Sequence, residues 1–186
     1  VDQITAEELA DRIDAGELGT LVDTRSGDSF EAWHVEGAEN VPYDPREGLD
    51  EEQLERIERV ADGTPVVTIC GKGLTSTPFA FELEEHGYEG VTVVKGGMED
   101  WSKVYEVVTV DTPEDDLVIR QIQRRGKGCL GYVVGSRDAG DAVVVDATRQ
   151  IGVYEIAAAE AGLAIRAVVD THVHADHLSG TPELAA

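Results

Sequence analysis

The sequence predicts an α/β protein in two segments: a parallel sheet flanked by helices over residues 1–105, and a smaller, strand-rich segment over residues 106–186. Short β-branched runs alternate with helical segments through the first hundred residues, which is the pattern of a parallel sheet. Near residue 106 the pattern changes to successive strands separated by hairpin-like turns. The charge changes there too, because 25 acidic and 8 basic residues lie in the first segment and 13 and 7 in the second.

The first segment begins with a helix that carries its own start signal. Residues 5–8 read Thr-Ala-Glu-Glu, a capping box, and apolar residues follow at helical spacing until Gly16. A proline stops one later strand at residue 42. In order, we expect strands over residues 20–24, 40–42, 65–70 and 91–94, and helices over residues 5–16, 29–34, 54–60 and 77–86, with a last helix ending at residue 101.

The second segment reads mainly as strands. Glycine-containing turns near residues 126–128 and 136–140 separate apolar runs, as in β-hairpins. We expect strands over residues 107–110, 117–123, 130–135, 142–146 and 164–170, and one helix over residues 154–161.

A cysteine stands where the most apolar strand of the first segment ends. Cys70 closes the β-branched run 65–69, and a loop with two glycines leads into residues 75–77, which can cap the next helix. Successive backbone N–H groups in such a loop form an anion nest, and the helix N-terminus adds partial positive charge. Both favour the thiolate, which is the nucleophilic form. The alternative is a buried structural cysteine. Cys129, which has no base nearby in the sequence, is interpreted as a packing residue.

The composition excludes several classes of partner. The formal charge is −23, from 38 acidic and 15 basic residues, so a nucleic-acid surface is not expected. Only four of the basic residues are lysines, and the acidic residues are dispersed, which resembles proteins of salt-accumulating halophiles such as haloarchaea. An ordinary acidic cytosolic protein is the alternative.

The sequence points to the cytoplasm. It contains no run of 18 apolar residues and no basic region followed by an apolar stretch, so neither a membrane span nor a signal peptide is expected. Two cysteines do not make a disulfide framework, which fits a reducing compartment.

Five ordered motifs carry a resemblance to a known family. They are Leu-Val-Asp-Thr-Arg at 21–25, residues 30–34, Val-Glu-Gly-Ala-Glu-Asn-Val-Pro at 35–42, the Cys70 loop, and Val-Val-Lys-Gly-Gly-Met-Glu-Asp-Trp at 93–101. Together they resemble a single rhodanese (sulfurtransferase) domain. The resemblance implies that Cys70 takes sulfane sulfur from a small donor, thiosulfate or a persulfide, becomes a persulfide, and passes the sulfur to a thiol acceptor without a cofactor.

The same resemblance assigns roles around the cysteine. Asp23 and Arg25 are expected to brace the active-site face. Lys72 is expected to attract the anionic donor. Thr75 stands where the family often has an arginine that helps bind anionic donors, which counts against thiosulfate as the donor. The backbone N–H groups of the loop are expected to hold the donor and the persulfide; the loop residues are Gly71, Lys72, Gly73, Leu74, Thr75 and Ser76.

A second motif follows the last strand of the second segment. Residues 171–177 read Thr-His-Val-His-Ala-Asp-His, and three histidines with one aspartate are typical metal ligands. A solvated polar loop is the alternative. The motif resembles metallo-β-lactamase-fold proteins, most of all persulfide dioxygenases and glyoxalase-II-type hydrolases, which implies a partial αββα fold. Iron or zinc ligands are then expected at His172, His174, Asp176 and His177, with Asp146 as the supporting residue.

The chain ends soon after this motif, at Ala186. The resembling families take another histidine and a bridging aspartate from further along, so we expect an incomplete fold whose strand faces are partly uncovered and could pair with a second copy. We also expect no stoichiometric metal in the isolated chain, because an incomplete ligand shell binds weakly.

Three functions remain open on the sequence. The first is a sulfurtransferase that depends on Cys70. The second is a metal-dependent hydrolase or persulfide dioxygenase in which the rhodanese-like segment only binds or regulates. The third is a non-enzymatic module that carries persulfide to a partner. Loss of sulfur transfer on replacing Cys70 would distinguish the first, whereas metal chemistry depends on His172.

Overall fold

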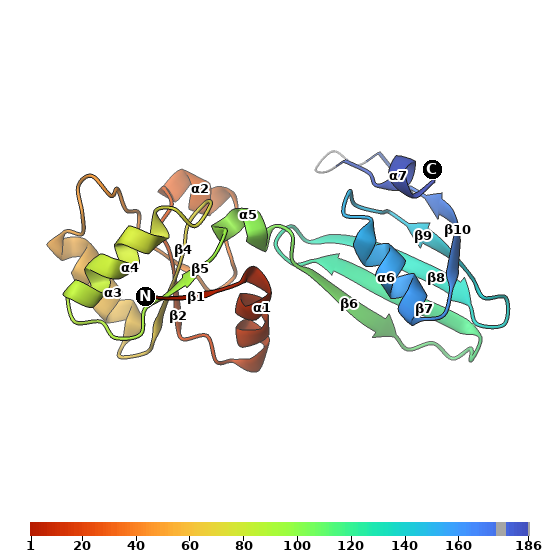
Figure 1. Ribbon diagram of the computed structural model, residues 1–186, viewed down its shortest axis with the longest axis horizontal. Coiled ribbons are helices and arrows are strands. Elements are labelled where there is room, and N and C mark those ends of the chain that lie inside the picture. The colour runs from red at the N-terminus through yellow and green to blue at the C-terminus, as the bar shows by residue number, and fades with distance from the viewer. Residues whose placement is uncertain (174–177, 186) are drawn as a thin grey trace. The chain divides into compact units, whose positions relative to one another are not determined.

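The computed structural model describes residues 1–173 and 178–185 of the chain and shows two compact units, Val1–Val104 and Tyr105–Ala186 (Figure 1). Tyr105, which the sequence analysis placed in the first segment, begins the first strand of the second unit. No helix in the described part of the chain is long and apolar enough to cross a membrane.

The first unit is built on a five-stranded parallel sheet, as the sequence predicted. Its strand order is β1-β5-β4-β2-β3, so β4 lies at the centre and the chain crosses over between neighbours. The strands are β1 (Asp2–Ile4), β2 (Thr20–Asp23), β3 (Glu39–Asn40), β4 (Val66–Ile69) and β5 (Thr92–Val94). The strand β1 was not predicted, because three residues are too few to show a period, and β3 covers residues 39–40 rather than the expected 40–42.

Helices cover both faces of this sheet. Residues of α1 and α5 share one apolar cluster with Val67 and Ile69 of β4, while residues of α3 and α4 share the other with Val66. Alternate residues of β4 therefore serve opposite layers, as strand geometry requires. The helices are α1 (Ala6–Ala15), α2 (Gly27–Ala32), α3 (Glu51–Ala61), α4 (Ser76–Glu85) and α5 (Gly97–Trp101).

Of the two predicted helix caps, the one at the start of α1 is present and the one at the start of α4 is not. The capping box at Thr5 is present, with the hydroxyl accepting from the Glu8 N–H. At α4 the expected cap is wrong, because the Thr75 side chain makes no capping hydrogen bond to the helix. The Thr77 hydroxyl donates instead to the Gly73 carbonyl, which closes the loop rather than the helix end.

The second unit is a five-stranded mixed sheet with order β10-β9-β8-β7-β6. Neighbours from β6 to β9 are antiparallel, and β10 joins β9 in parallel after the crossover through α6, which packs on one face. The elements are β6 (Tyr105–Val110), β7 (Leu117–Arg124), β8 (Cys129–Ser136), β9 (Asp141–Val145), α6 (Gly152–Glu160), β10 (Ala164–Val169) and α7 (Thr181–Leu184). Among the elements that the structure describes in this unit, α7, a single turn, was not predicted from the sequence.

Candidate active site at Cys70

Cys70 lies at the carboxyl end of the central strand of the first unit. It directly follows β4, whose neighbours β2 and β5 run in the same direction, so three strand ends meet beside it. Open α/β sheets place their sites at this edge. The residue is only 1% exposed, and residues 71–75 lead from it over the sheet edge to the start of α4.

Hydrogen bonds hold the Cys70 sulfur in an environment suited to a thiolate. The Ser76 hydroxyl lies 3.4 Å from Sγ, and Ser76 itself is fully buried. Burial alone would raise the pKa of the Cys70 thiol, but hydrogen bonds from the Ser76 and Thr75 hydroxyls and from the backbone N–H groups of Ser76 and Lys72 outweigh it and lower this pKa. The Thr75 hydroxyl therefore hydrogen-bonds to the sulfur rather than capping α4.

The backbone of α5 packs directly against the cysteine loop. The Met98 N–H donates to the Cys70 carbonyl at 2.7 Å, and the Glu99 N–H donates to the Gly71 carbonyl at 3.0 Å. A Cβ at Gly97, whose φ is +57°, would clash with the Cys70 carbonyl oxygen. The two segments therefore approach so closely that only glycine fits at this position.

Asp23 and Arg25 form a buried brace beside the strand ends. Arg25 donates from Nε and Nη2 to the Asp23 carboxylate, with a shortest distance of 2.6 Å, and also from Nη2 to the Trp33 carbonyl at 2.6 Å. The Asn40 amide donates to the carbonyls of Asp23 and Arg25 at 2.9 Å. The Arg25 charge is thus matched by a fully buried carboxylate.

The rim of the loop carries one cation and one apolar side chain. Lys72 is largely exposed, and its Nζ lies 3.7 Å from the Glu99 carboxylate. Leu74 is 75% exposed. The backbone and hydroxyl donors near Sγ, rather than a cluster of cations, therefore provide most of the positive potential at the sulfur.

In the second unit, one predicted residue supports the start of the histidine motif. Asp146 adopts φ +53°, and its carboxylate accepts hydrogen bonds from the Thr171 N–H and hydroxyl, both at 2.7 Å. The Thr171 hydroxyl also lies 2.8 Å from Nδ1 of His172. The other predicted ligands, His174, Asp176 and His177, lie outside the described residues. Within the described residues, no three metal-ligating side chains come together.

Cys129 differs from Cys70 in its surroundings. It begins β8, is half-buried, and its Sγ lies 4.0 Å from the Lys127 carbonyl, which is an acceptor rather than a donor. Cys70, in contrast, combines nearly complete burial with hydroxyl and N–H donors that favour the thiolate. The candidate nucleophile is therefore Cys70.

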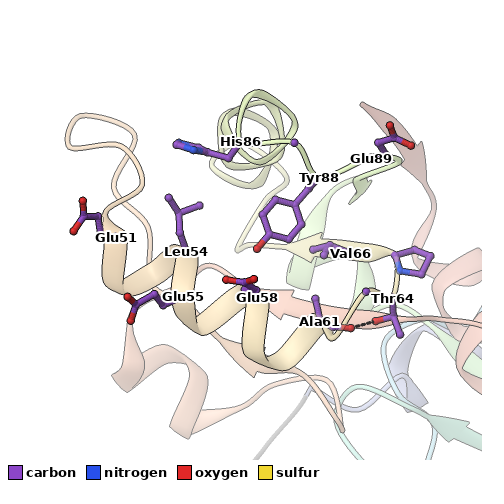
Figure 2. A pocket seen from close by; sticks show the side chains of 13 residues that line it. Glu51, Leu54, Glu55, Glu58, Ala61, Thr64, Val66, His86, Tyr88 and Glu89 are labelled. Carbon is purple, nitrogen blue, oxygen red and sulfur yellow. Dashed lines mark hydrogen bonds between the residues drawn. The ribbon is translucent and has the colours of Figure 1, made fainter.

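A pocket in the first unit lies away from Cys70. Its volume is about 880 Å³, and it lies between α3 and the segment after α4, where Tyr88 extends toward Glu58 (Figure 2). Val66, the first residue of β4, lines it, whereas Cys70 follows the last residue of the same strand. The pocket therefore lies at the opposite end of the sheet from the candidate active site.

The comparison with known proteins agrees with this geometry. The profile of the rhodanese-like domain family matches residues 5–104, which is more than half of the chain. This chain belongs to the rhodanese-like domain family. The thiosulfate sulfurtransferase GlpE of Tolumonas auensis is 34% identical over 85 residues, which cover 46% of this rhodanese-like chain and 74% of GlpE.

Solved structures similar to part of this rhodanese-like chain include two further proteins. A metallo-β-lactamase from Staphylococcus aureus is 30% identical, with a TM-score of 0.37, and the match covers 38% of this chain and 21% of that one. ETHE1 from Myxococcus xanthus is 30% identical, with a TM-score of 0.33, and the match covers 36% and 30%.

Sequence reasoning missed two residues at the site. Asn40 joins β3 to the backbone of Asp23 and Arg25, and Glu99 places a carboxylate beside Lys72. Both residues lie within motifs that carry the family resemblance, at 35–42 and 93–101, but no local pattern indicates the contacts that they make. The adjacent glycines at 96 and 97 belong to the motif at 93–101, and paired glycines can also signal the close backbone approach found at Gly97.

Proposed function

We propose that this rhodanese-like protein is a sulfurtransferase in which Cys70 carries sulfane sulfur as a persulfide. The observation that supports this most is the thiol itself, buried at the end of β4 and surrounded by hydroxyl and N–H donors that lower its pKa. A buried structural cysteine has no need of such donors, and the thiolate is the nucleophile in sulfur transfer. The similarity to a protein named as a thiosulfate sulfurtransferase supports the same reaction.

The reaction balances without a metal or a redox cofactor. The Cys70 thiolate attacks the outer sulfur of the donor, a sulfur–sulfur bond forms to Cys70, and the donor's own sulfur–sulfur bond breaks to release sulfite from thiosulfate or a thiolate from a persulfide. An acceptor thiolate then attacks the outer sulfur of the Cys70 persulfide and regenerates the Cys70 thiolate. The loop N–H groups stabilise the anionic persulfide between the two steps.

Intact-protein mass spectrometry tests the proposal. After exposure to a persulfide donor and removal of excess reagent, we expect one added sulfur in the unmodified protein and in Cys129→Ser, and none in Cys70→Ser. A thiol acceptor should then remove the added sulfur. Sulfur retained in Cys70→Ser but lost in Cys129→Ser would contradict the assignment.

The metal hypothesis for the second unit is a separate proposal. The Asp146 carboxylate bridges to Thr171 and so supports the backbone just before His172, which favours a structured start to the motif. The described residues by themselves do not form a metal centre, so a hydrolase or dioxygenase activity would need ligands from outside them. We expect elemental analysis after dialysis against a chelator to find no stoichiometric iron or zinc. One tightly held ion per chain would contradict that expectation.

A further inference from the structure

Four charged side chains near the mouth of the Cys70 loop balance one another. Glu99 lies 3.7 Å from Lys72 and 3.6 Å from Lys103, and Lys103 lies 2.8 Å from Asp100. Lys72 is the only cation among residues 71–76. The two ammonium groups therefore face two carboxylates, and the net charge of this group is zero.

Glu99 is held beside the loop by its backbone as well as by its charge. Its N–H donates to the carbonyl of Gly71, the residue that follows Cys70, at 3.0 Å. Exposed ion pairs of this kind contribute little to stability, because water and salt screen them. Their charges still contribute to the potential that an approaching ion meets.

We propose that Glu99, by neutralising Lys72, removes the advantage that doubly charged thiosulfate would otherwise have at the Cys70 site over singly charged sulfane-sulfur donors, such as organic persulfides and thiosulfonates. This inference rests on the sulfurtransferase function proposed above. A dianion is attracted by Lys72 and repelled by Glu99 with twice the energy of a monoanion in each case, so Glu99 cancels the advantage that an unpaired Lys72 would give the dianion. The groups that hydrogen-bond to the Cys70 sulfur are neutral N–H and hydroxyl dipoles. They stabilise one anionic sulfur and do not require the sulfane-sulfur donor to carry a second negative charge.

Two donors of similar size separate charge from shape. Thiosulfate carries two negative charges, and methanethiosulfonate carries one, with a methyl group in place of an oxygen. With methanethiosulfonate, the Cys70 thiolate attacks the outer sulfur, the Cys70 persulfide forms, and methanesulfinate leaves with the electron pair of the broken sulfur–sulfur bond. The two donors differ in intrinsic reactivity. This difference cancels when the kcat/KM of each donor is compared between a variant and the unmodified protein.

The test measures kcat/KM for both donors in Glu99→Gln at low salt. If the removed charge is taken to act over a distance of about 8 Å in water, kcat/KM is expected to rise about fivefold for thiosulfate and about twofold for methanethiosulfonate, because the Coulomb energy scales with donor charge. Glu99→Lys should roughly square both factors. In about 1 M KCl, where the Debye length is about 3 Å, the differences should largely disappear.

Glu89→Gln is the matched control, because it removes the same charge at the pocket at the other end of the sheet. Its ratio of thiosulfate to methanethiosulfonate activity should equal that of the unmodified protein. If Glu99→Gln leaves the ratio unchanged, or raises both activities equally, the inference about Glu99 is wrong while sulfur transfer stands. If neither donor loads Cys70 in any variant, the proposed function itself is wrong.

Discussion

At the scale of single residues, a competition between burial and hydrogen bonding determines how readily the Cys70 thiol ionises. A sulfur at 1% exposure would ordinarily stay protonated, because a low-dielectric interior disfavours the thiolate. Ser76, Thr75 and the loop N–H groups reverse that preference and lower the pKa. The result is a nucleophile that ionises more readily than an ordinary thiol yet is shielded from bulk solvent.

Thiol labelling tests this balance. Iodoacetamide reacts with thiolates, so Cys70 should reach half-maximal labelling rate at a lower pH than Cys129. Ser76→Ala removes a donor to the thiolate and should shift the Cys70 profile to higher pH, with the Cys129 profile unchanged as an internal control. Peptide-resolved mass spectrometry reads both sites at once. Identical pH profiles for the two cysteines would show that Cys70 is not activated.

At the scale of elements, the contact between α5 and the cysteine loop positions the site. Gly97 has φ +57°, and its Cα approaches the Cys70 carbonyl so closely that the space for a side chain is absent. The hydrogen bonds from Met98 and Glu99 to the loop then set the loop's conformation. A short helix far along the chain therefore determines where the loop N–H groups point.

Gly97→Ala tests this contact against a control with the same backbone conformation. Gly90 has φ +69° but open space around it, so Gly90→Ala should cost only the strain of a left-handed alanine, about 1–2 kcal/mol in the free energy of unfolding. Gly97→Ala should cost a further 1–3 kcal/mol, roughly, for displacement of packed backbone, and should also slow Cys70 labelling. Urea unfolding and labelling rates measure the two effects. Equal costs for the two variants would mean that the close contact is unimportant.

At the scale of the whole molecule, the dominant feature is the excess of acidic side chains. The formal charge of −23 is dispersed along the chain, and the acidic residues greatly outnumber the basic ones that could pair with them. Self-repulsion of this kind disfavours the compact state at low ionic strength, and salt screens it.

The melting temperature should therefore rise as KCl increases from millimolar to molar concentrations. Neutralising exposed acids, for example Glu85→Gln combined with Glu89→Gln, should reduce the slope of melting temperature against salt, because fewer charges remain to be screened. Differential scanning calorimetry at several KCl concentrations gives both slopes. A melting temperature that stays flat or falls would remove the halophilic interpretation.

The local sequence determined much of this protein. Alternating β-branched runs and capped helices predicted the parallel sheet of the first unit, and the strand–cysteine–glycine order of residues 65–73 indicated the candidate site. These features depend on periodicity and turn chemistry, which act between residues close in the chain. The three-residue strand β1 and the single turn α7 were not predicted, since neither is long enough to show a period.

Only the tertiary structure decided what surrounds the sulfur. The strand order β1-β5-β4-β2-β3 brings the segment after β5 beside the loop after β4, so Gly97 and Glu99 meet residues near Cys70. The same packing turns Thr75 toward the sulfur instead of the helix end. Local patterns cannot specify these contacts, because a side chain or backbone group takes whichever partner the order of the strands places within reach.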